Sequence, residues 1–145
     1  MDPTAFLAHF AHPHAPNFAL LAHVSPVILI HLGFAVVAFV IGAIQIIGPK
    51  GTLAHRILGW SWVVMMLTVA VSSFFIHIIN PSGFSLIHLL SVVTLIALPL
   101  AVYAARRHKV DMHSRIMTRL YVGALIIAGI FTFFPGRLMW AMFFG

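Results

Sequence analysis

The chain has 145 residues, of which 62% are apolar and only 7% are charged, and its mean hydropathy is +1.11. A water-soluble globule of this size needs more polar side chains to cover it, so the composition predicts an integral membrane protein. The chain contains no cysteine and only two acidic residues, which excludes disulfides, iron–sulfur clusters and thiolate zinc sites and argues against carboxylate chemistry. We interpret the net charge of +6 as a sign of topology and of contact with anionic lipid, not of nucleic-acid binding.

The first 23 residues differ in pattern from the rest of the chain. They lack the basic start of a secretory signal and contain no continuous apolar run, so we expect residues 1–23 to form a retained arm at the membrane interface. His9, His12 and His14 are spaced like a metal-binding tract, but two prolines prevent a regular helix there and loop histidines usually bind nothing. Residues 24–145 are expected to form a single transmembrane domain.

Four apolar segments, each long enough to cross a bilayer, follow the arm. Short stretches of Gly, Pro, Ser and charged residues separate them. The predicted fold class is therefore all-α, with membrane helices at about residues 24–47, 53–79, 84–105 and 116–134. Because loops this short force neighbouring helices to be antiparallel, we expect a polytopic four-helix up-and-down bundle.

The basic residues indicate how this bundle is oriented. Seven of the eight fall at the first and third connections between helices, and none falls at the second. They are Lys50, Arg56, Arg106, Arg107, Lys109, Arg115 and Arg119. By the positive-inside rule we expect these two connections to face the cytoplasm, and both termini the periplasm, of a bacterial inner membrane.

Histidines lie at two depths in the expected bundle. At a rise of about 1.5 Å per residue, His31, His77 and His88 come to nearly the same depth near the periplasmic side. His55 and His113 form a shallower layer near the cytoplasmic side. Because histidine is uncommon inside a membrane segment, such residues are functional candidates by default.

Small and polar residues share a helical face with His31. They follow it at helical spacing and form a narrow stripe: Ala35, Ala38, Gly42 and Gln45. A purely structural interpretation accounts for the same pattern, because small residues let membrane helices approach closely and a terminal histidine can bond a carbonyl or a headgroup.

Diagonal pairs of these histidines are suited to haem. Two histidines that hold one haem stand on helices separated by the width of the macrocycle, and adjacent packed helices, about 8 to 10 Å apart, are too close. In an up-and-down bundle the first and third helices are diagonal, as are the second and fourth. The topology thus predicts one b-type haem between His31 and His88 and another between His55 and His113.

Other residues complete the candidate cofactor-binding set. Glycine beside a haem plane leaves room for the macrocycle, so Gly42 and Gly59 are included, together with Gln45. We expect His77 to hydrogen-bond a haem propionate or a quinone carbonyl. Alternatively, His77 joins the outer pair, His31 and His88, in a three-histidine site for Cu, Zn or Fe, although no acid is available to orient the rings.

Several stretches of the chain together resemble a family of small bacterial predicted membrane proteins, common in proteobacteria and grouped as a domain of unknown function. They are HLGFAVVAFVIGAIQ, HRILGWSWVVMM, SSFFIHIINPSGFSLIHLLSVVTLIALPLAV and HSRIMTRLYVGALIIAGIFTFFPGRLMWAMFFG. The resemblance covers residues 30–145 and implies four helices and a bacterial inner membrane, but no established activity. The family pattern falls on His31, Gln45, His55, Arg56, Gly59, His77, His88, His113, Arg119 and Arg137.

The chain departs from the family pattern at one position, and it also resembles a second group of proteins in layout. Trp140 stands where relatives often carry another histidine, which argues against a ligand role for the C-terminal tail. The helix count and histidine placement are also similar to those of transmembrane di-haem b cytochromes.

The leading functional hypothesis is a membrane redox module that binds haem b and exchanges electrons with a quinone or a larger complex. The rival hypothesis is a non-catalytic accessory subunit of a respiratory or photosynthetic complex that binds lipid, quinone or pigment. Metal or proton transport is a third hypothesis, but no acid lies inside the membrane and four helices would need a homo-oligomer to form a pathway. Nucleophilic catalysis has no candidate, because no acid can complete a triad with Ser72 or Ser73.

Overall fold

The computed structural model describes residues 15–79 and 86–144, apart from the side chains of residues 77–79 and 86–87. Within these residues every regular element is a helix, which confirms the predicted all-α fold. Four helical stretches are long and apolar enough to cross a membrane, as the sequence predicts. The histidine tract of the N-terminal arm and the side chain of His77 lie outside the described residues.

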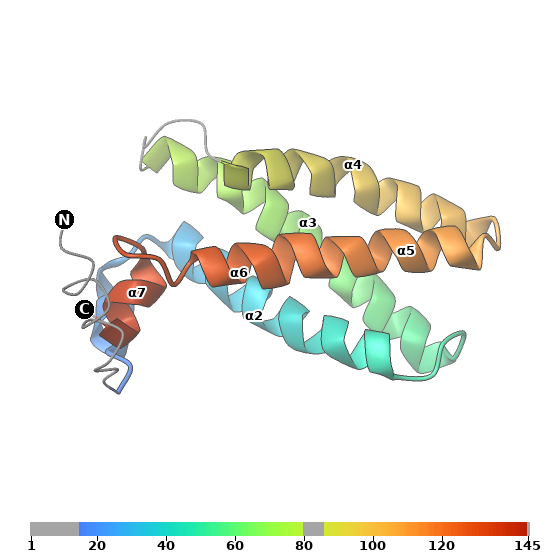
Figure 1. Ribbon diagram of the computed structural model, residues 1–145, viewed down its shortest axis with the longest axis horizontal. Coiled ribbons are helices and arrows are strands. Elements are labelled where there is room, and N and C mark those ends of the chain that lie inside the picture. The colour runs from blue at the N-terminus through green and yellow to red at the C-terminus, as the bar shows by residue number, and fades with distance from the viewer. Residues whose placement is uncertain (1–14, 80–85, 145) are drawn as a thin grey trace, which may run out of the picture.

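The four membrane helices differ in regularity. Three are continuous α-helices: α2 (Pro26–Ile47), α3 (Leu53–Ile79) and α4 (Leu86–Arg106). The fourth runs without a break through three parts: α5 (Val110–Leu120), the π-helical segment η2 (Tyr121–Ile127) and α6 (Ala128–Phe131). The α2–α3 and α4–α5 connections lie at one end of the bundle (Figure 1), which we call the basic end because seven Lys and Arg residues lie in or near these connections.

Two short helices lie at the opposite end, which we call the terminal end (Figure 1). They are the 3-10 helix η1 (Phe18–His23) and the two-turn helix α7 (Leu138–Phe144). The backbone N–H of Asn17 donates to the carbonyl of Met142 over 3.0 Å. The described part of the predicted arm is therefore attached to the C-terminal helix, which the sequence-based assignment of helices did not include.

The predicted start of the first helix needs a small correction. α2 begins at Pro26, two residues after the predicted Val24, because Ser25 caps it. The Ser25 hydroxyl accepts from the N–H of Ile28, and proline is favoured at the first helical position because its missing N–H would be unsatisfied there. The second helix has the predicted bounds, and α4 ends one residue beyond the prediction.

The fourth helix starts well before its predicted position. It begins at Val110, six residues before Ile116, because the polar stretch that hydropathy assigned to a loop continues the helix beyond its apolar part. It ends at Phe131 instead of Phe134. The N–H groups that follow donate to carbonyls three residues back, which is the tighter pattern in which helices commonly end.

The helices form a closed ring. Each packs against the next one in sequence, and η2 completes the ring against α2 (Figure 1). α2 is therefore diagonal to α4, and α3 is diagonal to the fourth helix, as expected for an up-and-down bundle.

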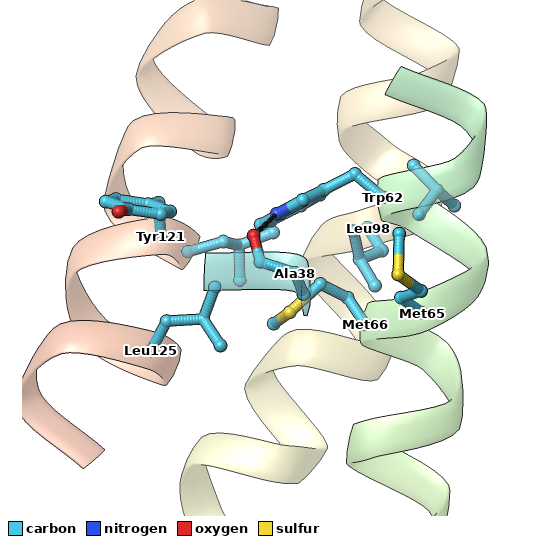
Figure 2. Close-up of a cluster of buried hydrophobic side chains, with 9 residues drawn as sticks. Ala38, Trp62, Met65, Met66, Leu98, Tyr121 and Leu125 are labelled. Atoms are coloured by element: carbon cyan, nitrogen blue, oxygen red, sulfur yellow. Dashed lines mark hydrogen bonds between the residues drawn. The ribbon is translucent and has the colours of Figure 1, made fainter. Parts of the chain in front are cut away.

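An apolar core fills the middle of this ring. Ala38 of α2 lies between side chains of α3 and of the fourth helix (Figure 2). The indole N–H of Trp62, a residue only 2% exposed, donates to the Ala38 carbonyl over 2.9 Å, and the Tyr121 hydroxyl donates to the Phe39 carbonyl over 3.2 Å. Two aromatic side chains thus use their polar tips to bond α2 from both neighbouring helices.

The turn between α4 and α5 is tight, although no glycine lies in it. His108 has a φ of +56°, a left-handed conformation that glycine usually supplies. The N–H groups of His108 and Lys109 donate to the carbonyls of Ala105 and Ala104, which is the Schellman pattern of helix termination. This turn lays α5 directly back along α4.

Candidate functional site

In the outer histidine layer, His31 is held by a hydroxyl group. The Ser72 hydroxyl donates to the Val69 carbonyl over 3.0 Å, so His31 Nδ1, 2.9 Å from the Ser72 oxygen, is the donor in that second bond. This assigns the proton of His31 to Nδ1 and leaves its Nε2 as the atom with a lone pair. Such a bond to one ring nitrogen commonly orients the other nitrogen as a ligand or proton acceptor.

A cavity of about 50 Å³ lies beside His31 at the centre of the bundle. All four membrane helices line it, and its polar walls come from His31, Ser73, Ser91 and Thr94. The hydroxyls of Ser73 and Ser91 lie 2.7 Å apart and join α3 to α4. A cavity of this size, partly polar and mostly apolar, has room for a few water molecules but not for a macrocycle.

His88 of α4 lies in the same layer as His31. It is 9% exposed and lies three residues before Ser91 on α4, which is about 4.5 Å along the helix. Its ring lies 6.2 Å from that of Phe74. α2 and α4, which carry His31 and His88, are diagonal in the ring. The cavity beside His31 is too small for a haem, so a haem between the two histidines would have to move the helices apart.

His77, the third residue of the expected three-histidine metal site, has its side chain outside the described residues. Among the side chains that the structure describes, no group of three or more His, Cys, Asp or Glu lies close enough to hold a metal ion.

The inner layer brings four predicted residues together. The Gln45 amide of α2 donates to the His55 carbonyl over 2.9 Å. A Cβ on Gly59 would lie 3.1 Å from that same amide nitrogen, so Gly59 lets Gln45 lie across α3. His55 is also close enough to His113 for their charges to interact. Gln45, His55, Gly59 and His113 thus form one cluster that joins α2, α3 and α5.

The two inner histidines differ in how their rings are held. His113 Nδ1 lies 2.9 Å from the Ala101 carbonyl and must donate to it, which leaves Nε2 with its lone pair. His55 Nδ1, in contrast, is buried and has no hydrogen-bond partner. A buried polar atom without a partner is costly, and such atoms often mark a site for water, an ion or a ligand.

Gly42 has a different surrounding from the one predicted. Its bare face is covered by the Tyr121 ring and the Trp62 indole, and a Cβ there would lie 2.6 Å from Tyr121 Cε2 and 2.8 Å from Trp62 Nε1. These side chains fill the space that a cofactor beside Gly42 would need. In this structure Gly42 therefore serves helix contact, which is the structural interpretation of its stripe.

Sequence reasoning missed part of the site. Nothing in the sequence indicated the bond between Ser72 and His31. The π-helical segment η2 was also not predicted, since neither a proline nor a charged residue marks it. η2 contributes Ala124 to the central cavity, and π-helical turns occur often at functional sites.

A comparison with known families decides what this bundle is related to. A family described as "Predicted membrane protein (DUF2306)" matches residues 28–143. The chain belongs to the DUF2306 family. The DUF2306 match covers the four membrane helices, except for the first two residues of α2, and both histidine layers. It agrees with the predicted family of uncharacterised membrane proteins. No curated protein and no solved structure matches the chain significantly. The likeness to di-haem b cytochromes stays a prediction.

Proposed function

We propose that this DUF2306 protein is a bacterial inner-membrane redox module that holds haem b at its basic end, between His55 and His113, and exchanges electrons with a membrane quinone. The observation that carries the proposal is the unpartnered, buried Nδ1 of His55 close to a histidine whose own Nδ1 is held by a backbone carbonyl. The two histidines stand on diagonal helices, the arrangement that leaves most room for a macrocycle.

The residues of the inner layer meet the chemical needs of this cofactor better than those of the outer layer. The bond from His113 to the Ala101 carbonyl fixes the ring and directs Nε2 away from α4. Gly59 offers a bare helix face one turn from His55, but the Gln45 amide covers that face, so binding requires Gln45 to rotate away. A bound haem b would supply a one-electron redox centre.

Absorption spectra of the full chain test the proposal. The protein, purified from cells supplied with a haem precursor, should show a Soret band and a pyridine haemochrome, and His55→Ala and His113→Ala should each remove most of the bound haem. His113→Met, which keeps a ligand atom, should retain haem with a more positive midpoint potential. His108→Gly is the control, because it removes an exposed histidine at the same end and suits the left-handed backbone there. Helix content and elution volume show whether each variant folds.

The alternative outcomes are distinct. A chain that takes up no haem, either in cells or on reconstitution, contradicts the proposal. If that chain also leaves the membrane with a stoichiometric partner, the accessory-subunit hypothesis is favoured instead. Haem that survives both inner-layer variants but is lost in His31→Ala would place the cofactor in the outer layer. Failure of a short-chain quinol to reduce bound haem would contradict the quinone part of the proposal.

The proposed orientation puts the basic end in the cytoplasm. This orientation is supported by the distribution of basic residues. Seven Lys and Arg residues lie at the basic end, whereas in the described chain only Arg137 lies near the terminal end. Because the chain has no cysteine, single-cysteine variants give unique labels. A membrane-impermeant maleimide should label Pro135→Cys on intact spheroplasts and Pro49→Cys only after lysis, and the reverse pattern would invert the topology.

A further inference from the structure

A groove of about 350 Å³ lies between α3 and α4, apart from the histidine layers. Its walls are apolar or aromatic and include Trp60 and Leu67 of α3 and Pro99, Val102 and Tyr103 of α4. Trp60 and Tyr103 are each 52% exposed, so the groove opens on the outside of the bundle, where lipid surrounds the protein. We propose that this groove binds one anionic phospholipid, with an acyl chain along the groove and the phosphate on Arg106.

The groove has the direction of an acyl chain and covers about two thirds of the roughly 15 Å that such a chain spans in one leaflet. Trp60 and Leu67 are seven residues apart on α3, and Pro99 and Arg106 are seven apart on α4, so each wall extends about 10 Å along its helix. α3 and α4 separate toward the basic end (Figure 1). The groove therefore runs along the helices from near the basic end toward the middle of the bundle, parallel to the chains of the surrounding lipid.

The charge at the mouth of the groove selects the headgroup. Arg106 is the last residue of α4, and its guanidinium carbon lies 5.8 Å from the centre of the Trp60 ring. This contact holds the cation at the polar end of an otherwise apolar groove. Asp111, the one acidic residue in the described chain, forms no ion pair with Arg106. The guanidinium is therefore available to bond phosphate oxygens, which match its planar array of donors.

The surrounding residues favour an anionic phospholipid over a neutral ligand of the same shape. Arg107, stacked 5.4 Å from the Tyr103 ring, and the exposed Lys109 add positive charge beside the mouth. A quinone has a neutral headgroup and gains little from these cations, whereas a phosphodiester gains a charge-assisted hydrogen bond. Basic pockets between membrane helices are known to take anionic headgroups.

Native mass spectrometry of the full chain with equal amounts of phosphatidylglycerol and phosphatidylcholine of identical acyl chains tests the proposal. Both lipids carry a phosphodiester, but only phosphatidylcholine brings an ammonium group to the cations at the mouth. Because these like charges repel, the wild-type chain should retain phosphatidylglycerol in about tenfold preference. Arg106→Gln should remove the preference. Arg119→Gln, which removes the same charge from α5 outside the groove, should keep it. Leu67→Trp, which fills the apolar part, should reduce retention of both lipids.

Three results would overturn the proposal. They are an absence of preference in the wild-type chain, an equal loss of preference in both arginine variants, and unchanged retention in Leu67→Trp. Displacement of phosphatidylglycerol by an equimolar short-chain quinone would assign the groove to quinone instead. Glycerophosphoglycerol has the same headgroup but no acyl chains. If it displaced phosphatidylglycerol at the same concentration, the apolar groove would contribute nothing to binding. None of these measurements depends on haem, so they are independent of the proposed redox function.

Discussion

Gly42→Ala is expected to destabilise the bundle by about 2 kcal/mol, the usual cost of overpacking a filled core, and Gly42→Leu by more. The added Cβ would overlap the Tyr121 ring and the Trp62 indole, which approach α2 from opposite neighbours. Neither ring can easily retreat, because each bonds a backbone carbonyl of α2 through its polar tip. The measurement is the free energy of unfolding in mixed micelles titrated with dodecyl sulfate.

The matched control for this prediction lies on the same helix. A Cβ on Gly33 would meet nothing within 4 Å, so Gly33→Ala should leave stability unchanged or raise it slightly, as alanine favours helix. In a Tyr121→Leu background the cost of Gly42→Ala should fall by at least half, because one of the two obstacles is gone. An equal cost in both backgrounds would mean that Tyr121 does not pack on Gly42.

Trp62→Ala is expected to destabilise the bundle by about 3 kcal/mol, since it leaves a large void among Ala38, Met66 and Leu98. Trp62→Phe keeps most of the ring and loses only the indole N–H, so it should cost about 1 kcal/mol. The difference between the two variants separates packing from hydrogen bonding. Both costs are measured in the same mixed-micelle titration.

Trp60→Phe is the control for the Trp62 variants. Trp60 stands two residues away on the same helix but is 52% exposed on the lipid side, so its replacement should change stability by less than about 0.5 kcal/mol. A cost for Trp60→Phe as large as that for Trp62→Phe would contradict the assignment of Trp62 to the core.

Composition and hydropathy were sufficient to predict the number of membrane helices and their order, because a membrane segment must satisfy its backbone internally and must span a fixed thickness. The same rule failed at Val110. The first turns of α5 lie beyond the apolar part of the helix, so their polar side chains carry no hydropathy signal although the backbone is helical. α7 is only seven residues long and too short for the rule to detect.

The depth of the histidines was predictable, but their partners were not. Counting residues places His31 and His113 in their layers, since the rise per residue is fixed. Which atom each ring bonds depends on how the helices rotate and pack, and the sequence does not specify those angles. The Ser72 hydroxyl and the Ala101 carbonyl are therefore found only in the structure. The role of Gly42 was not predictable either, because its small size is compatible both with a cofactor beside it and with an aromatic neighbour.

The π-helical segment Tyr121–Ile127 lies between two α-helical parts of the fourth helix and offsets the side-chain phase of one from that of the other. A π-turn holds more residues than an α-turn, so residues beyond it do not continue the α-helical phase that starts at His113. One helix thus places His113 in the inner layer and Ala128 at the central cavity. In evolutionary terms, a one-residue insertion or deletion between Tyr121 and Ile127 would rotate Ala128 relative to the cavity while His113 kept its place.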